Sequence, residues 1–330
     1  MNSNFCLKEP IDIVYLWCDG DDPAFKLQKK RLMEKLGIFP NENEELIGEK
    51  RFSNHDELKY SLRSVYSYLP WINHIYIVTN KQVPIWLSYH PKLTIVDHTE
   101  IIPKEFLPTF SSITIETYIG NIRGLSEKFL YFNDDIFINR ALSPSDFFDG
   151  NKPIIWVKNF RKDLKIKDYN NLLVNEKHPW VKSILRSWGV FCTRNNLKVP
   201  YMNPNHTVDA FTKTDYKNML KKYPGLVQAN SAHFRNGNEI SRHIFAYEMV
   251  YLHGCRVIKR ENETALGRAL CLLGLKRTTA VGGRTLDKLI KNIYRYRPNT
   301  FCVNEIKPRD KELFKTFIQK KFPNKAPWEL

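Results

Sequence analysis

The sequence predicts an α/β protein with a mostly parallel central sheet, flanked by helices and followed by a helical C-terminal extension. In the first 150 residues of the 330-residue chain, buried-strand patterns alternate with helical patterns, which is typical of crossover units. Polar side chains directly follow several of these strands, and ligands bind at the carboxyl ends of parallel strands. We therefore expect an α/β core at 1–150. At 151–330 we expect the remainder of the same domain, with a basic and helical C-terminal part.

Each predicted element rests on a local pattern. Apolar runs bounded by turn residues predict strands, and apolar residues at helical spacing predict helices. Pro23 suits the first turn of a helix and Pro70 ends one, so these prolines bound two predicted helices. The first part is expected to contain a strand at 11–17, a helix at 23–36, a loop at 37–50, a helix at 56–69, strands at 74–79 and 93–96, a helix at 111–122 and a strand at 129–132. Beyond it we expect a polar excursion or mobile lid at 161–177 and helices at 179–193, 239–252 and 308–322.

The charge balance is strongly basic. The chain has 51 Lys and Arg against 35 Asp and Glu, which gives a formal net charge of +16. Such a charge favours anionic partners: nucleic acid, a phosphate-rich polymer, sugar nucleotides or an anionic membrane face. For any single basic cluster, a solubilising surface is the simpler explanation.

The bulk composition predicts a soluble cytoplasmic protein. A hydrophobic content of 42% and a charged content of 26% are ordinary for a globular domain. No apolar run reaches the length of a membrane span, and the N-terminus lacks the pattern of a signal peptide. The six cysteines include no CxxC pair, so we expect reduced thiols rather than a disulfide framework or a zinc site.

The segment KFLYFNDDIFINR, at 128–140, holds the strongest chemical signal. A buried strand runs directly into Asn133, Asp134 and Asp135, and a second apolar pair follows. Adjacent carboxylates at a strand end repel each other and are costly to desolvate. A divalent cation relieves both costs, and Mg²⁺ or Mn²⁺ suits such oxygen ligands and often holds substrate phosphates. The alternative is an ordinary turn with solvated acids.

Several blocks of the chain resemble the conserved regions of the Stealth proteins, a family of hexose-1-phosphate transferases. The first two regions are matched by IDIVYLWCDGDDP, by RFSNHDELKYSLRSVYSYLPWINHIYIVTNKQVPIWL and by LPTFSSITIETYIGNIRGLSEKFLYFNDDIFINRALSPSDFF. The third and fourth are matched by NPNHTVDAFTKTDY and SAHFRNGNEISRHIFAYEMVYLHG, and FPNKAPWEL is similar to the C-terminal element. Cys18 stands where the family pattern has Val, a conservative change.

This resemblance implies a GT-A-like core and a defined reaction. A UDP-sugar, with an N-acetylhexosamine as the expected sugar, gives its sugar 1-phosphate to an acceptor hydroxyl. UMP leaves, and a phosphodiester-linked capsule polymer grows. The expected partners are the donor and the growing oligosaccharide. The basic C-terminal third, including 307–321, is expected to contact either anionic lipid at the inner membrane face or the phosphodiester polymer. Two rivals remain: a conventional metal-dependent glycosyltransferase that releases UDP, and a nucleic-acid-binding protein, for which no module is visible.

The resemblance also suggests roles for individual side chains. Asp135 is expected to act in catalysis and, with Asp134, to bind the metal. His206 is the candidate general base because imidazole titrates near neutral pH. Arg235 is expected to stabilise the departing UMP, with His233 as a secondary candidate.

The remaining candidates lie in the first two regions. Asp19 and Gly20, at the end of the first strand, are expected to contact uridine, ribose or metal, and capping of the helix at Pro23 is the equal alternative for Asp19. Arg51 and Arg63 are expected to clamp diphosphate oxygens, although Arg63 is equally suited to a buried ion pair. The turn between them contributes three candidates. These are Asn54 as a binding residue, Asp56 as a catalytic residue, and Glu57, for which an acid in the first turn of a helix is the simpler explanation. Asn133, beside the two aspartates, is a further binding candidate.

Overall fold

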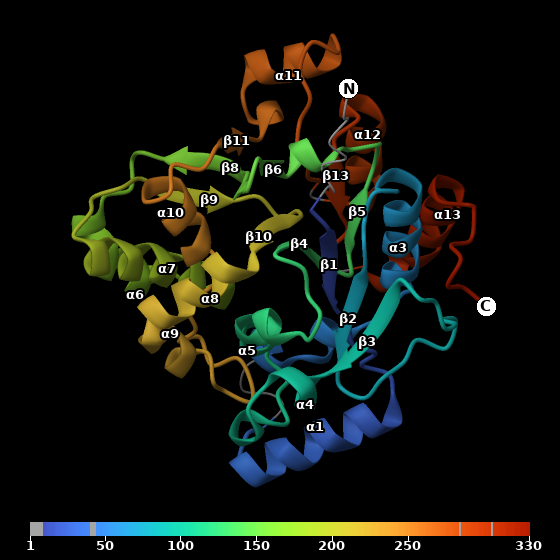
Figure 1. Cartoon of the computed structure of the whole chain (residues 1–330), viewed down its shortest axis with the longest axis horizontal. Coiled ribbons are helices and arrows are strands. Elements are labelled where there is room, and N and C mark those ends of the chain that lie inside the picture. Colours follow the sequence, from blue (N-terminus) through green and yellow to red (C-terminus); the bar gives the residue numbers. More distant parts are fainter. Residues whose placement is uncertain (1–8, 40–43, 284, 305) are drawn as a thin grey trace, which may run out of the picture.

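The computed structural model describes residues 9–39, 44–283, 285–304 and 306–330. Its centre is a five-stranded sheet in the order β10-β4-β1-β2-β3 (Figure 1). The strands are β1 (Ile11–Leu16), β2 (Ile75–Thr79), β3 (Leu93–Asp97), β4 (Lys128–Asn133) and β10 (Asp209–Thr212). All neighbours pair in parallel except β10, which runs antiparallel to β4. The predicted α/β class with a mostly parallel sheet is confirmed.

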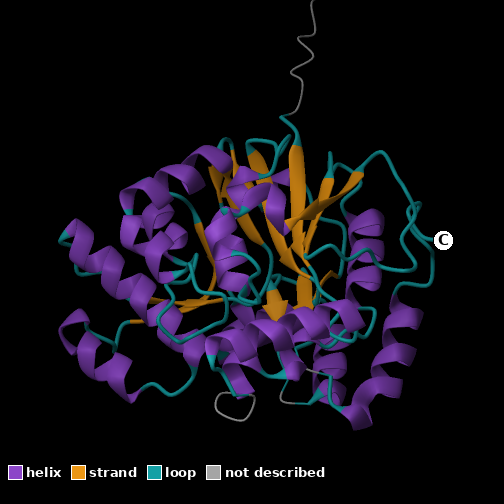
Figure 2. Ribbon diagram, turned by 90° about the horizontal axis from the view of Figure 1, so that it is seen from below, coloured by secondary structure: helices purple, strands orange, loops and turns teal. Residues whose placement is uncertain are grey.

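Alternating side chains of each strand enter two different cores, which makes the molecule three layers thick. On β1, Val14 packs into one core, whereas Ile13 and Tyr15 pack into the other. The sheet accordingly lies between two groups of helices in Figure 2. Burial on both faces explains why the strands read as continuous apolar runs.

The helices on the two faces come from different parts of the chain. The first core includes side chains of α5 (Ser112–Tyr118), α7 (Pro179–Asn195), α8 (Lys213–Lys222) and α10 (Ile244–Tyr251). The second core includes α3 (Glu57–Tyr68) and β5 (Ile136–Ile138). The remaining helices described are α1 (Pro23–Leu36), α2 (Glu44–Ile47), α4 (His98–Ile101), α6 (Tyr169–Asn175), α9 (Pro224–Ala229), α11 (Ala265–Leu272), α12 (Leu286–Tyr296) and α13 (Lys311–Lys321).

Three smaller sheets complete the architecture. The strands β11 (Val257–Lys259), β8 (Ile155–Arg161) and β9 (Tyr201–Pro204) form one sheet, and β12 (Ala280–Val281), β13 (Thr300–Cys302) and β5 form another. A two-stranded ribbon pairs β6 (Phe148–Asp149) with β7 (Lys152–Pro153). Because β10 joins the central sheet and β13 pairs with β5, segments after residue 150 complete the core that precedes it. The boundary at 150 itself stays a prediction.

Most local predictions match the structure, and three differ from it. The helix expected at 239–252 begins only at Ile244, as α10. The predicted loop at 37–50 contains α2 and the start of a 3-10 helix at Glu49–Phe52, while residues 40–43 lie outside the described part. The polar excursion at 161–177 carries α6, whose apolar residues pack on the first core. The five described cysteines are free thiols, and Cys6 lies outside the described residues. In the part of the chain that the structure describes, no helix is long and apolar enough to cross a membrane.

Candidate active site

The carboxyl ends of three central strands bring polar side chains to one edge of the sheet. Leu16, at the end of β1, pairs with Val78 of β2 and with Asn133 of β4. Beyond these ends, the Gln82 side-chain amide donates to the carbonyl of Asp19 at 2.9 Å and accepts from its N–H at 3.0 Å. The predicted meeting of these strand ends at one edge is therefore present.

Three carboxyl groups lie close together at this edge. Burial, followed by the charges of Asp135 and Glu57, raises the pKa of Asp134 well above its ordinary value. Glu57 accepts the His55 N–H at 2.5 Å, yet burial dominates and raises the pKa of Glu57 to about 7. Both shifts favour the protonated forms of Asp134 and Glu57, and a bound cation would oppose them. From the sequence, Glu57 is expected to be an ordinary acid in the first turn of a helix. Its burial near Asp134 depends on how distant segments pack, which the sequence pattern does not reveal.

Asp135 belongs to a group that can hold a metal ion. Ligand atoms of Asp135, His206 and Cys302 all lie within 4.8 Å of one another. The Cys302 thiol donates to Asp135 Oδ2 at 3.1 Å. The other carboxylate oxygen, Oδ1, is buried and has no hydrogen-bond partner in the described structure, so it is available to a cation.

The chemistry of this group differs from the predicted pair of aspartates. Asp134 is not among its members, and Cys302 takes a place that the sequence did not indicate. Mg²⁺ prefers oxygen ligands, whereas a carboxylate, an imidazole and a sulfur together suit a transition metal. Of the two expected ions, Mn²⁺ therefore fits the residues better. Cys302 arrives because β13 pairs with β5, which places it opposite Ile136.

His206 lies on an exposed loop whose two flanking residues are anchored. Asn205 donates to Thr279 Oγ1 at 2.7 Å, and Thr207 shares a hydrogen bond with Thr300. The imidazole stacks on Trp180 with ring centroids 6.3 Å apart. The loop thus holds His206 beside the metal group while leaving its ring accessible.

A hydrogen-bonded relay sets the orientation of that imidazole. The Tyr131 hydroxyl donates to Asn133 Oδ1 at 3.0 Å, which turns the Asn133 amide nitrogen toward His206 Nε2 at 3.1 Å. An amide N–H can only donate, so Nε2 is the accepting nitrogen. Glu116 Oε1 also lies 3.1 Å from the Tyr131 hydroxyl and competes with Asn133 Oδ1 for its single proton, and Glu116 in turn contacts a group of arginines.

The arginine group consists of Arg51, Arg235 and Arg242. Arg242 forms ion pairs with Glu116 and Asp209, each at 2.8 Å, and lies over the Tyr131 ring at 4.2 Å. Arg235 donates through Nη2 to Ser112, whereas its buried Nε has no partner in the described structure. Although Arg51 retains exposed surface, desolvation of its guanidinium, followed by the charge of Arg235, lowers its pKa to about 10. Two guanidinium groups held near each other are suited to bind an anion.

Gly20 connects the first strand to the segment that carries Arg51. Its N–H donates to the Phe52 carbonyl at 2.7 Å, and a Cβ at position 20 would lie 2.3 Å from that oxygen. Only glycine permits this approach, so Gly20 positions backbone. The helix α1 is capped by Asp22, which accepts from Phe25 N–H at 2.7 Å, and not by Asp19. Asp19 instead accepts the Asp21 N–H at 3.0 Å.

Arg63 lies outside the arginine group, so the expectation that it clamps diphosphate oxygens does not fit the structure. Its Nε and Nη2 each donate to Glu329 at 2.7 Å, and its Nη1 donates to the carbonyls of Phe322 and Pro323. Through these bonds, the guanidinium of Arg63 holds the C-terminal segment against α3. The alternative named for this residue, a buried ion pair, is what the structure contains.

Three further candidates have local structural roles. His233 Nδ1 lies 2.8 Å from the Pro108 carbonyl, in the loop that precedes α5. Asp56 is exposed in a left-handed conformation with φ 64°, and its N–H donates to Asn54 Oδ1 at 3.1 Å. Neither Asp56 nor Asn54 belongs to the metal group. Sequence reasoning also missed Glu116, Asp209 and Arg242, which carry no local motif.

A known protein family matches this part of the chain. Residues 51–155 match the family model described as Stealth protein CR2, conserved region 2. This part of the chain is similar to the second conserved region of the Stealth proteins. The predicted resemblance to this family is confirmed, and the matched region contains Arg51, Asp134 and Asp135.

Several relatives have the names of bacterial capsular polysaccharide phosphotransferases. A capsular polysaccharide phosphotransferase of Neisseria meningitidis serogroup B is 29% identical over 308 residues, which cover 90% of this chain and 77% of the relative. The capsular polysaccharide phosphotransferase LcbA of Aeromonas hydrophila is 42% identical over 46% of this chain and 42% of its own length. The protein of the same name from Neisseria meningitidis is 46% identical over 43% of this chain and 38% of its own. The match thus spans less than half the length of these last two relatives.

Solved glycosyltransferases are more distant. The bifunctional glycosyltransferase WbbM has a TM-score of 0.45 at 13% identity, covering 100% of this chain and 52% of its own. The galactosyltransferase LgtC has a TM-score of 0.41 at 11% identity, and the match covers 96% of this chain and 98% of the LgtC chain. At these scores the similarity has no bearing on chemistry, and a GT-A-like assignment of the fold stays a prediction.

Proposed function

We propose that the chain transfers a hexose 1-phosphate from a UDP-sugar to a sugar hydroxyl, making a phosphodiester and releasing UMP. The phosphotransferase names of its relatives support a role in capsule or exopolysaccharide synthesis. The observation that carries the proposal is that a group able to hold a cation and a group able to bind an anion lie at the same edge of the sheet. The metal group, at His206, is joined through Asn133, Tyr131 and Glu116 to the arginine group, at Arg242.

This arrangement suits a diphosphate. A cation held by Asp135 and Cys302 would neutralise charge on the phosphate oxygens. Arg51 and Arg235 are placed to bind the departing UMP phosphate, because guanidinium groups match phosphate geometry. Phosphoryl transfer depends mainly on such positioning and charge stabilisation.

The reaction exchanges one bond to phosphorus for another. The acceptor oxygen forms a bond to the β-phosphorus, while the bond from that phosphorus to the oxygen bridging it to UMP breaks. The hydroxyl proton must pass to a base, and we assign this role to His206, whose Nε2 would accept it once the acceptor hydroxyl takes the place of the Asn133 N–H. Asn133 thus acts as a positioning residue.

The nucleotide released tests the reaction class. Incubation of the purified chain with a panel of UDP-sugars and an oligosaccharide primer, followed by phosphorus NMR, should reveal UMP and a new phosphodiester. Release of UDP with a plain glycosidic product would instead establish a conventional glycosyltransferase.

The role of His206 is tested separately. A His206→Ala variant that retains Mn²⁺ binding but loses transfer at neutral pH supports a base. Loss of Mn²⁺ binding in the same variant identifies a ligand, and normal turnover removes His206 from the mechanism. Asp135→Ala should lose both metal binding and transfer, and EDTA should stop the reaction of the wild type.

We also propose peripheral contact with anionic lipid at α11, while the contact expected at 307–321 stays a prediction. α11 stands away from the central sheet (Figure 1), and four leucines on it and just after it are between 47% and 71% exposed: Leu266, Leu272, Leu273 and Leu275. Exposed Arg268, Lys276 and Arg277 accompany them, and such a mixture favours an anionic bilayer surface.

Vesicle sedimentation tests this contact. The wild type should sediment with phosphatidylglycerol vesicles and less with neutral phosphatidylcholine vesicles, and Leu273→Ser should weaken the binding. Leu27→Ser, which removes a 48% exposed leucine from α1 at the opposite end of the view in Figure 1, is the matched control. Equal sedimentation of the two variants would refute the role of α11.

A further inference from the structure

A cavity of about 420 Å³ opens beside the metal group and lies outside the arginine group. It shares His206 and Cys302 with the metal group. Its other walls come from the end of β12, the start of α12 and the segment after β13, together with Arg260. The volume is in the range of sites for small ligands, so the cavity can take a sugar unit with an attached group.

The lining of this cavity is cationic. Arg260, Lys307 and Arg309 contribute positive charge, and Asp310 is the single carboxylate among its lining residues in the described structure. The N-terminal end of α12 also faces it, through Thr285 and Leu286, and adds the positive end of a helix dipole. An anionic ligand is therefore favoured over a neutral one.

Arg260 is held in position by its own neighbours. Its Nε donates to Asn262 at 3.0 Å and pairs with Glu263 at 3.1 Å, and the side chain is largely buried. A Cβ at Gly282 would lie 3.4 Å from Nη2 and 3.9 Å from Nη1, so both outer nitrogens lie at the cavity wall beside this glycine. A fixed guanidinium with its outer nitrogens at a wall is suited to bind phosphate.

We propose that this cavity binds the last phosphodiester of the acceptor oligosaccharide, with Arg260 and Lys307 as the residues that recognise its charge. The inference rests on the proposed function, in which every addition leaves one phosphodiester behind the new terminal sugar. The terminal hydroxyl then lies toward His206, at the end of the cavity shared with the metal group. The donor diphosphate occupies the arginine group on the other side of the Tyr131 relay.

This arrangement makes the enzyme prefer its own product as acceptor. An oligomer with an internal phosphodiester has an anion for the cavity, whereas an unphosphorylated sugar has none. A charge-assisted hydrogen bond to phosphate is strong enough to change affinity about tenfold. The preference should appear in the KM for acceptor and leave the KM for the donor unchanged.

The test compares two acceptors and three variants of the full chain. The acceptors are a dimer of the product joined by a phosphodiester and the same dimer joined by a neutral methylphosphonate. Arg260→Gln and Lys307→Gln should each raise the KM for the charged dimer about tenfold and leave that for the neutral dimer unchanged. Lys315→Gln removes an equal charge from exposed α13, outside the cavity, and should behave as wild type.

Direct binding separates this inference from the proposed reaction. Calorimetry with the charged dimer, without donor, should show binding by the wild type and about tenfold weaker binding by Lys307→Gln, an exposed residue whose loss does not threaten folding. Unchanged binding in both cavity variants, or equal weakening in Lys315→Gln, overturns the cavity assignment. Intact binding with no nucleotide released from any UDP-sugar instead contradicts the proposed function.

Discussion

Replacing Arg63 with alanine should destabilise the protein rather than stop its chemistry. The guanidinium forms two 2.7 Å bonds to Glu329 and further bonds to two carbonyls. The side chain of Glu329 is only 1% exposed, so the substitution would leave a buried carboxylate without its partner. Breaking a buried pair in this way costs about 3–5 kcal/mol.

Thermal unfolding and steady-state kinetics measure the two consequences. For chains of about 150–250 residues, 1 kcal/mol corresponds to about 2–4 °C, so on this scale the Tm should fall by about 6–20 °C. At a temperature where the variant stays folded, kcat should remain near that of the wild type. Lys59→Ala, which removes a more distant cation 4.0 Å from Glu329, should lower the Tm far less.

The pH dependence adds a check on the same pair. Burial raises the pKa of Glu329, but the hydrogen bonds from Arg63 and the Ala326 N–H, together with the charges of Arg63 and Lys59, outweigh it and lower this pKa below its ordinary value of 4.5. A lowered carboxyl pKa stabilises the fold above the unfolded value and loses that effect as the pH falls through the folded value. The Tm difference between wild type and Arg63→Ala should therefore shrink below about pH 4. An unchanged Tm with a large loss of kcat would refute this reasoning and restore Arg63 as a phosphate clamp.

Three further predictions follow from the carboxyl cluster and its surroundings. The pKa of Glu57 rises from 4.5 in the unfolded chain to about 7 in the folded protein, so in EDTA the folded state should lose stability as the pH rises between these two values. Glu57→Gln should make the plot of Tm against pH flatter over this range. Cys302→Ala should weaken Mn²⁺ binding about tenfold while Cys271→Ala does not, and bound Mn²⁺ should slow alkylation of Cys302; equal affinities would exclude the thiol as a ligand. Gly20→Ala should destabilise the protein by about 1–3 kcal/mol, because its Cβ would meet the Phe52 carbonyl; an unchanged Tm contradicts that contact.

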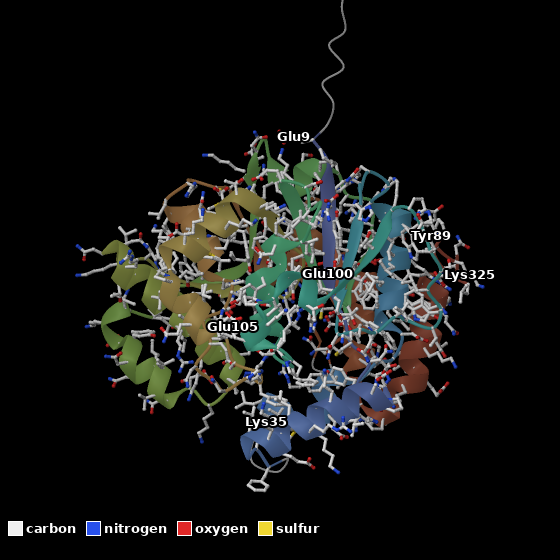
Figure 3. The ribbon with its side chains drawn as sticks, turned by 60° about the horizontal axis from the view of Figure 1, so that its bottom comes forward. Glu9, Lys35, Tyr89, Glu100, Glu105 and Lys325 are labelled. Carbon is white, nitrogen blue, oxygen red and sulfur yellow. The ribbon has the colours of Figure 1, made fainter. Side chains whose placement is uncertain are left out.

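Side chains at the periphery give a reference surface for such experiments. Tyr89, in the segment between β2 and β3, is 91% exposed and points outward at the edge of the molecule (Figure 3). Lys35 of α1 is also at the margin in this view. Substitutions at these two positions should leave stability within about 0.5 kcal/mol of the wild type and serve as general controls.

Much of the local structure could be predicted, because it depends on neighbours in sequence. The prolines and apolar spacing placed α1 at Pro23–Leu36 and the end of α3 before Pro70. A buried run ending in Asn133-Asp134-Asp135 indicated a strand whose polar end faces a site. The meeting of these strand ends followed from the rule that parallel strands end at a common edge.

The composition of the site depended on long-range packing. Cys302 joins Asp135 across 167 residues because β13 adds to β5, and no pattern around either residue encodes that pairing. Arg63 meets Glu329 across 266 residues, and only the folded chain distinguishes this pair from a phosphate clamp. The sequence by itself determined which segments become strands and helices and where acidic side chains end a strand, since these depend on local sterics and periodicity. The tertiary structure alone decided which distant side chains became partners, because burial of the two faces of the sheet determines how those segments pack together.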